Sequence, residues 1–83
     1  MKLSIIIPCY NEENTIEKIV DKVLEATKNI EKELIVVDDF SSDKTRSIIE
    51  NNLTNKIDLI VLNSKNYGKG YSLREGIKKA TGE

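Results

Sequence analysis

The chain has 83 residues, enough for one small domain with a modest core. Charged residues make up 33% of the chain but nearly cancel to a net charge of −1, so the charge balance points to neither nucleic acid nor an anionic membrane as a partner. A single cysteine, Cys9, excludes an internal disulfide, and the chain has no histidine to act as the base that a catalytic thiol needs. We expect Cys9 to be a half-buried apolar group.

Three apolar runs are predicted to be strands. They are Leu3–Ile7, Leu34–Val37 and Leu59–Leu62, and each is continuously apolar rather than alternating. Continuous runs are typical of parallel strands that are covered on both faces. None approaches the ~20 apolar residues of a membrane span, and the run ending at Pro8 is too short for the core of a signal peptide. With no paired cysteines, these features favour a cytoplasmic location.

The segments between and after these runs have the apolar spacing of helices. The third helix is expected from about Tyr71 to Ala80, with Leu73, Ile77 and Ala80 facing inward. The stripes of the first two helices are Ile16, Ile19, Val20, Val23 and Leu24, then Ile48, Ile49 and Leu53. Alternation of strand and helix predicts an α/β fold: three layers, α/β/α, around a parallel sheet of three strands in the order 3-2-1 with right-handed crossovers.

Polar residues follow each predicted strand at its carboxyl end, which is where open parallel sheets bind ligands. After the first strand, Pro8 is expected to end the ladder because it donates no hydrogen bond. Tyr10 then offers a flat ring on which a base could stack, or alternatively packs over the first helix. Glu12 lies in the same loop.

Asp38 and Asp39 follow the second strand. Adjacent carboxylates repel each other and are costly to bury, and in a strand they point to opposite faces, so we expect them to have different roles. One would accept hydrogen bonds from the N–H of a base or from a ribose hydroxyl, and the other would cap the loop through Ser41–Asp43. The alternative is that both are turn and cap residues.

The loop after the third strand contains Tyr67-Gly68-Lys69-Gly70. Glycines let a backbone approach a ligand, and a helix N-terminus favours anions. The spacing matches neither G-x-x-x-x-G-K-[ST] nor G-x-G-x-x-G. Lys65 and Lys69 suit a diphosphate, and they are equally ordinary for a solvent-exposed loop.

Taken together, the stretches SIIIPCYNEE, ELIVVDDFSSDKT and NYGKGYSLREGIKKATGE resemble glycosyltransferase family 2, whose members have the glycosyltransferase A fold. The greatest likeness is to polyprenol-phosphate (dolichol-phosphate-like) mannosyl- and glucosyltransferases. The resemblance spans essentially residues 1–83, and it identifies them as a truncated nucleotide-sugar-binding portion, from the N-terminal part of such an enzyme.

The resemblance implies an inverting transfer of a hexose from a nucleotide diphosphate sugar to an acceptor, with a polyprenol phosphate as the candidate. The implied binding residues are Pro8, Tyr10 and Glu12 for the nucleoside, Asp39 and secondarily Asp38 for the base or ribose, and Gly68 with the Lys69 region near the base or the diphosphate. A full-length protein of this kind would lie in the cytoplasm or at the cytoplasmic face of the membrane.

The chain departs from the family in lacking an Asp-x-Asp, the motif that binds a divalent metal, Mg or Mn, on the donor diphosphate. The family places this motif after a Gly-Asp or Gly-Glu like Gly82-Glu83. We therefore expect no catalytic residue and no bound metal in this chain, and no activity from the chain alone.

Two further interpretations stay open, together with a prediction about assembly. One is a non-catalytic nucleotide-binding or regulatory module. The other is a receiver-like signalling domain, against which stand Glu12-Glu13 and Asn63 at the positions where a receiver has its acidic pair and acceptor aspartate. In the family a fourth strand lies beside the first, so Leu3–Ile7 is expected to be an exposed edge and to mediate a homo-oligomer.

Overall fold

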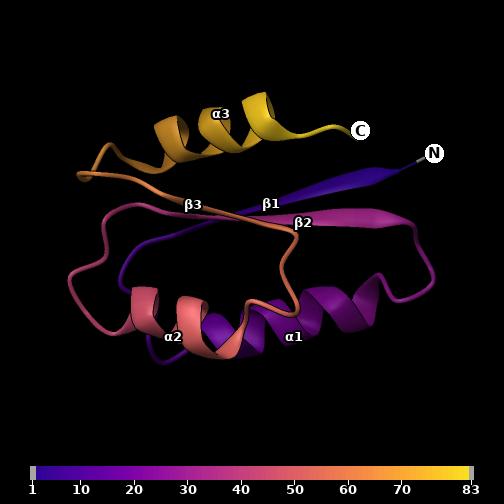
Figure 1. Ribbon diagram of the computed structural model, residues 1–83, viewed down its shortest axis with the longest axis horizontal. Helices are drawn as coiled ribbons and strands as arrows, with labels where there is room; N and C mark the ends of the chain where they lie inside the picture. The colour runs from indigo at the N-terminus through magenta and orange to yellow at the C-terminus, as the bar shows by residue number, and fades with distance from the viewer. Residues whose placement is uncertain (1, 83) are drawn as a thin grey trace.

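The computed structural model describes residues 2–82. Glu83, the second residue of the Gly82-Glu83 motif, therefore lies outside the described part. In chain order the elements are β1 (Leu3–Cys9), α1 (Ile16–Ala26), β2 (Lys32–Asp38), α2 (Thr45–Asn52), β3 (Leu59–Leu62) and α3 (Lys69–Lys79). The strands form one parallel, three-stranded sheet in the order β1-β2-β3 (Figure 1). The predicted α/β fold and strand order are confirmed.

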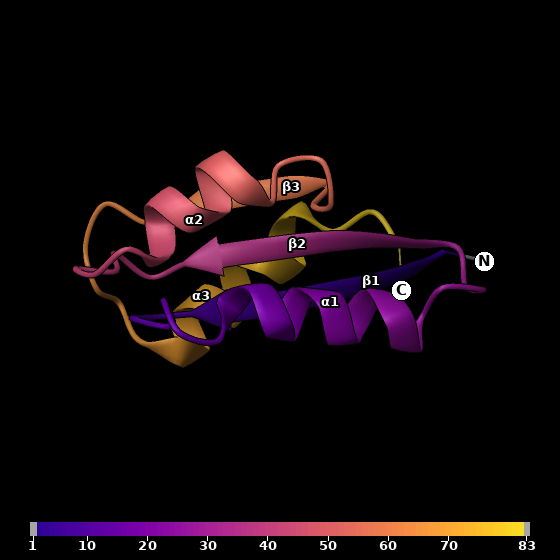
Figure 2. The same ribbon diagram turned by 90° about the horizontal axis from the view of Figure 1, so that it is seen from below.

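Helices cover both faces of the sheet. Figures 1 and 2 show α1 and α2 on one face and α3 on the other, which gives three layers. β2 is the central strand, and every residue from Leu34 to Asp38 is buried, as its continuous apolar run predicts. Within residues 2–82, no helix has both the length and the apolar character needed to cross a membrane.

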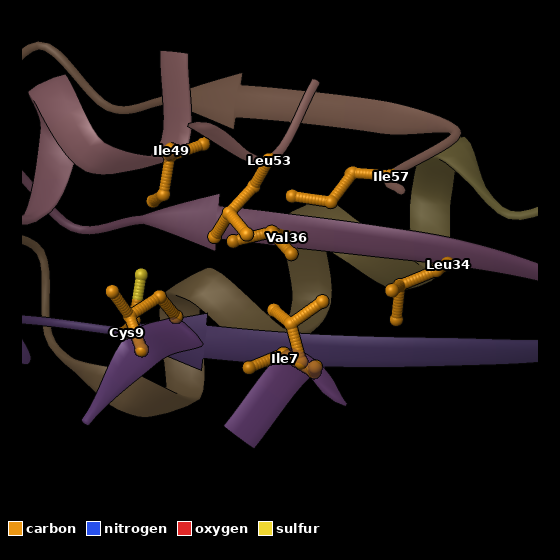
Figure 3. Packing of buried hydrophobic residues seen from close by; sticks show 9 residues of the cluster. Ile7, Cys9, Leu34, Val36, Ile49, Leu53 and Ile57 are labelled. Carbon is orange, nitrogen blue, oxygen red and sulfur yellow. The ribbon is translucent and has the colours of Figure 1, made fainter. Parts of the chain in front are cut away.

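The main core lies between the sheet and the α1–α2 layer (Figure 3). Its side chains come from alternate positions of the strands and from the predicted helix stripes, and each contributes about 1.5–3 kcal/mol by leaving water. The buried cluster consists of Ile7, Cys9, Leu34 and Val36 from the sheet and Ile16, Val20, Ile49, Leu53 and Ile57 from the helical layer and the chain after α2.

β1 is longer than predicted and does not end at Pro8. Pro8 pairs in register with Val37, and Cys9 with Asp38, so the ladder continues through both residues. The prediction that Pro8 ends the strand is wrong because β1 is an edge strand, where a missing N–H can face away from the neighbouring strand. The extension carries β1 up to the rim where the loops begin.

α3 packs with a different face from the one expected. Leu73 is 36% exposed and Ile77 is 61% exposed, whereas Ser72 and Gly76 are buried against the sheet. A Cβ atom on Gly76 would collide with the Ile6 side chain. The inward orientation predicted for Leu73 and Ile77 is therefore wrong, because small residues let α3 approach β1 more closely than leucine and isoleucine would allow.

This close approach predicts opposite effects for two glycines of the same helix. Gly76→Ala should destabilise the protein by about 1–2 kcal/mol, because overpacking at Ile6 outweighs the gain in helix propensity. Gly70→Ala should stabilise it by about 0.5–1 kcal/mol, since the nearest atom to the added methyl is on Arg74, 4.0 Å away. Urea denaturation followed by circular dichroism measures both, and equal shifts would contradict the packing described.

The chain after α3 is tied to the amino ends of β1 and β2. The Glu33 carboxylate accepts hydrogen bonds from Ser4 Oγ at 2.6 Å, from Thr81 Oγ1 at 2.9 Å and from Gly82 N at 3.2 Å. Lys2 Nζ lies 3.6 Å from the same carboxylate. The hydrogen bonds from Ser4 and from the Thr81 backbone lower the pKa of Glu33 to about 2.

The low pKa of Glu33 predicts how this attachment responds to acid. Because the pKa of Glu33 is lowered in the folded state, the stabilisation that its carboxylate gives the folded protein is complete above the ordinary pKa of 4.5. It is lost as the pH falls toward about 2. The amide resonances of Thr81 and Gly82 should hold their positions from pH 7 to 4.5 and move only below it. In Glu33→Gln they should already be displaced at pH 7; unchanged resonances there would refute the attachment.

Candidate functional site

The three loops that leave the carboxyl ends of the strands meet at one rim of the sheet, at the left of Figure 2. They surround a hollow with a cavity volume of about 160 Å³. Its lining comes from the end of β1, the loop after it, the residue after β2 and the first turn of α3. The lining residues are Pro8, Cys9, Tyr10, Glu12, Asp39, Lys69 and Ser72.

Five of the six residues predicted from the sequence line this hollow: Pro8, Tyr10, Glu12, Asp39 and Lys69. They come from three segments far apart in the chain, and the parallel topology brings them together because all three strands end at the same rim. The sixth, Asp38, is not part of the lining.

Asp38 is fully buried and its carboxylate is occupied inside the protein. It forms an ion pair with Arg46, whose Nη2 lies 2.8 Å from Oδ2, and accepts hydrogen bonds from Ser41 N at 3.1 Å and Ser41 Oγ at 2.6 Å. Arg46 also donates to the backbone oxygen of Asn63 at 2.9 Å. Asp38 therefore ties the β2–α2 loop, α2 and the end of β3 together, as the capping role expected for one aspartate requires.

Asp39 faces the opposite way and holds the β3–α3 loop. It is 4% exposed, and it accepts hydrogen bonds from Asn63 Nδ2 at 2.9 Å, Tyr67 N at 2.9 Å and Gly68 N at 2.8 Å. Burial by itself would raise the pKa of Asp39, but these donors outweigh it and lower the pKa. Asp39 is therefore a carboxylate at neutral pH, at the wall of the hollow.

The loops after β1 and β2 are bound to each other. Asn11, at a φ of 53° that asparagine tolerates, donates from its backbone N to Ser41 Oγ at 2.9 Å and accepts from Ser42 N at 2.8 Å. Glu12 N donates to Thr45 Oγ1 at 2.7 Å. These bonds fix the part of the chain that carries Tyr10 and Glu12 relative to Asp39.

The lining has an aromatic surface and groups of opposite charge. Tyr10 lines the hollow and is 45% exposed, so part of its side chain is accessible to a ligand. Lys69, the first residue of α3, is the cationic residue of the lining, and Glu12 and Asp39 are its anionic residues. Gly68, with a φ of 94°, turns the chain into the helix in a conformation that favours glycine.

Cys9 lines the hollow but lacks the properties of a nucleophile. Its side chain is buried, and burial together with the negative charge of Asp38 raises the pKa of the thiol to about 12. The thiol is therefore protonated at neutral pH, where only the thiolate reacts. Its position agrees with the apolar role expected, although it is more deeply buried than half.

The sequence model of glycosyl transferase family 2 matches residues 4–83. The chain belongs to this family. Membership confirms the resemblance drawn from the residues after β1, β2 and β3, and it sets aside the receiver-like alternative.

Relatives of this chain include sugar transferases whose names contain a lipid phosphate and a poly-beta-1,6-N-acetyl-D-glucosamine synthase of Staphylococcus aureus, 38% identical over 95% of this chain and 19% of its own length. An undecaprenyl-phosphate 4-deoxy-4-formamido-L-arabinose transferase of Proteus mirabilis is 36% identical over 99% of this chain and 26% of its own length. A dolichyl-phosphate beta-glucosyltransferase of Trichomonas vaginalis is 33% identical over 98% of this chain and 28% of its own length. The chain thus spans about a quarter of the length of such relatives.

Solved structures share the fold of this chain. TarS of Staphylococcus aureus, residues 1–349 in complex with UDP, superposes with a TM-score of 0.82 at 33% identity, over 100% of this chain and 25% of its own. A mannosyltransferase of Pyrobaculum calidifontis in complex with GDP-Man and Mn²⁺ gives a TM-score of 0.80 at 30% identity, over 98% of this chain and 25% of its own. The glycosyltransferase A fold expected from the sequence is confirmed.

The described residues do not fit a divalent metal such as the Mn²⁺ in the mannosyltransferase structure. Among residues 2–82, no group of three or more histidine, cysteine, aspartate or glutamate side chains lies close enough to hold a metal ion. The adjacent carboxylates of Asp38 and Asp39 point apart, toward Arg46 and toward the β3–α3 loop. We derive no step through a metal from this part of the chain.

The sequence analysis gave no binding role to four residues that build the site: Cys9, Arg46, Asn63 and Ser72. Ser72 lies three residues after Lys69, on the same face of α3, so helical spacing could have predicted its place in the lining. Asn63 follows directly after β3, as Asp39 follows β2. Arg46 carries no local signal, because its partner Asp38 is recognised only through the fold.

Proposed function

We propose that the hollow is the donor-nucleotide site of an inverting family 2 glycosyltransferase. The reaction would transfer a hexose from a nucleotide diphosphate sugar, with a polyprenol phosphate as the acceptor. The observation that carries this proposal is the convergence of Tyr10, Asp39 and Lys69 on one hollow. The UDP and GDP-Man complexes of the structural neighbours and the lipid-phosphate names of the relatives support it.

The charges of the lining favour one orientation of the nucleotide. A diphosphate would be repelled by Glu12 and Asp39, which instead suit the N–H and hydroxyl groups of a base and ribose. Tyr10 offers a ring for stacking, worth about 1–3 kcal/mol per base. Lys69, at the start of α3, suits the diphosphate. Pro8 lies in the lining beside Tyr10 and completes the nucleoside side.

In this proposal the chain binds the nucleotide sugar but does not catalyse the transfer of the sugar. Residues 1–83 would act as the nucleotide-sugar-binding portion, with no catalytic residue among them, and Mg or Mn would act through other residues. The alternative, a non-catalytic nucleotide-binding module, predicts the same hollow. A sugar-transfer assay on a protein that contains this chain and is as long as the relatives distinguishes the transferase from the module, since the module would bind the donor and transfer no sugar.

Binding of UDP and of uridine, measured by calorimetry on the 83-residue chain, tests the proposal. Tyr10→Ala should weaken both ligands about tenfold, because both contain the base. Lys69→Ala should weaken UDP and leave uridine unchanged, because only UDP carries the diphosphate. Lys22→Ala, an exposed lysine of α1, serves as the control. Absence of binding by the unmodified chain to UDP and GDP would refute the site.

Self-association through β1 is a further proposal about this chain. β1 is an edge of the sheet, and Leu3 on it is 39% exposed. An unpaired edge strand is a template for pairing with a second copy. Light scattering at high concentration should show a dimer or larger species that Leu3→Lys, at the exposed position of this strand, reduces to monomer. A monodisperse monomer from the unmodified chain would contradict self-pairing.

A further inference from the structure

A buried polar cluster forms part of the wall of the hollow. Its members are Asp39, 4% exposed, Asn63, 7% exposed, and Ser72, fully buried. They come from the ends of β2 and β3 and from the first turns of α3. Burying polar side chains costs stability unless they are hydrogen-bonded, so a cluster of this kind has to be mutually satisfied.

Asn63 is the centre of the cluster. Its Nδ2 donates to Asp39 Oδ1 at 2.9 Å and to Ser72 Oγ at 3.2 Å, so both amide hydrogens are used. Its backbone N donates to Asp38 O at 2.9 Å, and its backbone O accepts from Arg46 at 2.9 Å. With backbone and side chain both held, Asn63 presents its amide to Asp39 in one fixed direction.

The hydrogen bonds of Asp39 leave it one place for a ligand. A carboxylate has about four acceptor positions, two on each oxygen. Oδ1 accepts from Asn63 Nδ2 and from Tyr67 N, which fills both of its positions. Oδ2 accepts from Gly68 N, and the Ser72 hydroxyl is a further, weaker donor to the carboxylate that also lowers its pKa. Asp39 lines the hollow, so a donor bound there would find the remaining acceptor position on Oδ2.

We propose that Asn63 is a positioning residue of the nucleotide site: by holding Oδ1 of Asp39, it keeps the remaining acceptor position of Oδ2 directed at an N–H or hydroxyl group of the bound nucleoside. Through Ser72 it also fixes Asp39 relative to the helix turn that begins with Lys69. This inference rests on the proposed function. It predicts that Asp39 recognises the nucleoside end of the nucleotide, since Asp39 cannot accept a hydrogen bond from a phosphate oxygen that carries no proton.

Asn63→Ala tests the inference with two probes, uridine for the nucleoside end and pyrophosphate for the Lys69 end. Uridine binding should weaken about tenfold, as for loss of one hydrogen bond to a charged group. Pyrophosphate binding should stay unchanged. A purely structural role would weaken both probes together. Asn52→Ala, an exposed asparagine at the end of α2, is the matched control.

A second readout needs no ligand. The carboxyl ¹³C resonance of Asp39 should titrate at a higher pH in Asn63→Ala than in the unmodified chain, because one donor to the carboxylate is gone. Glu12 and Lys69 on the hollow side, and Asp38 with Arg46 behind it, are the other charged groups near this carboxylate, and the substitution leaves them unchanged.

The outcomes separate the inference from the proposed function. If the unmodified chain binds no nucleoside and neither UDP nor GDP, both are overturned. If it binds UDP or GDP but no nucleoside, only the inference is overturned. If it binds uridine and Asn63→Ala binds it equally well, only the positioning role is overturned. Should Asn63→Ala fail to fold by circular dichroism, Ser72→Ala removes the partner at 3.2 Å and should weaken uridine binding about two- to threefold. Unchanged uridine binding in Ser72→Ala would then overturn the inference.

Discussion

Asp38→Ala is expected to lower the free energy of unfolding by about 3 kcal/mol. The substitution leaves the Arg46 guanidinium without its carboxylate and removes the acceptor of both Ser41 donors. Breaking a buried ion pair costs about 3–5 kcal/mol, and the lower value applies here because the Arg46 side chain is 28% exposed and water can reach it. For a chain of this length, with a total stability of about 4–12 kcal/mol, that loss is a large fraction.

An exposed aspartate provides the control for this prediction. Asp21 pairs with Lys56 at 2.9 Å, but its side chain is 59% exposed, so Asp21→Ala should cost less than about 1 kcal/mol. Urea denaturation followed by circular dichroism measures both variants. Similar losses for Asp21→Ala and Asp38→Ala would show that burial does not distinguish the two ion pairs.

Asp39→Ala is expected to release the β3–α3 loop and to abolish nucleoside binding. The amide of Asn63 and the backbone N–H groups of Tyr67 and Gly68 lose their acceptor. Each unsatisfied buried donor costs about 1–3 kcal/mol, but the donors of the released loop can bind water instead. We therefore expect the free energy of unfolding to fall by about 2–3 kcal/mol in total. Hydrogen exchange should accelerate more at Tyr67 and Gly68 than in α1, because the loop is released locally while α1 responds only to the lower global stability.

The same contacts set the acid response of this loop. Because the pKa of Asp39 is lowered in the folded protein, the stabilisation from its carboxylate is complete above the ordinary value of 3.8 and is lost as the pH falls below it.

Glu50→Ala, at an exposed position on α2, is the control for Asp39→Ala and should leave both hydrogen exchange and uridine binding unchanged. Retained nucleoside binding in Asp39→Ala would contradict a direct role for this carboxylate.

The two neighbouring aspartates show how far local pattern can lead. Their adjacency after an apolar run, and the alternation of side chains in a strand, predicted different roles for Asp38 and Asp39. Which aspartate took which role depended on partners far away in sequence. Arg46 reaches Asp38 from α2, and Asn63, Tyr67 and Gly68 reach Asp39 from beyond β3.

α3 marks the limit of hydrophobic periodicity. Leu73 and Ile77 have helical spacing, and the sequence predicted them to face the core, but the buried face is Ser72 and Gly76. Hydrophobic periodicity depends only on the positions of apolar residues, so it cannot predict that a helix packs closer to the sheet with its small residues facing inward. The decision came from Ile6 on β1, which occupies the space that a side chain at position 76 would need.

The sequence alone determined the α/β fold, the parallel order of the strands and the rim at which Tyr10, Asp39 and Lys69 meet. These follow from continuous apolar runs and from the residues directly after them, which are local features of the chain. Only the tertiary structure decided which helix face is buried, that Asp38 is withdrawn from the hollow, and that Asn63 holds Asp39. Those outcomes depend on close packing and on hydrogen bonds between segments distant in sequence, where partners are fixed by geometry rather than by residue type.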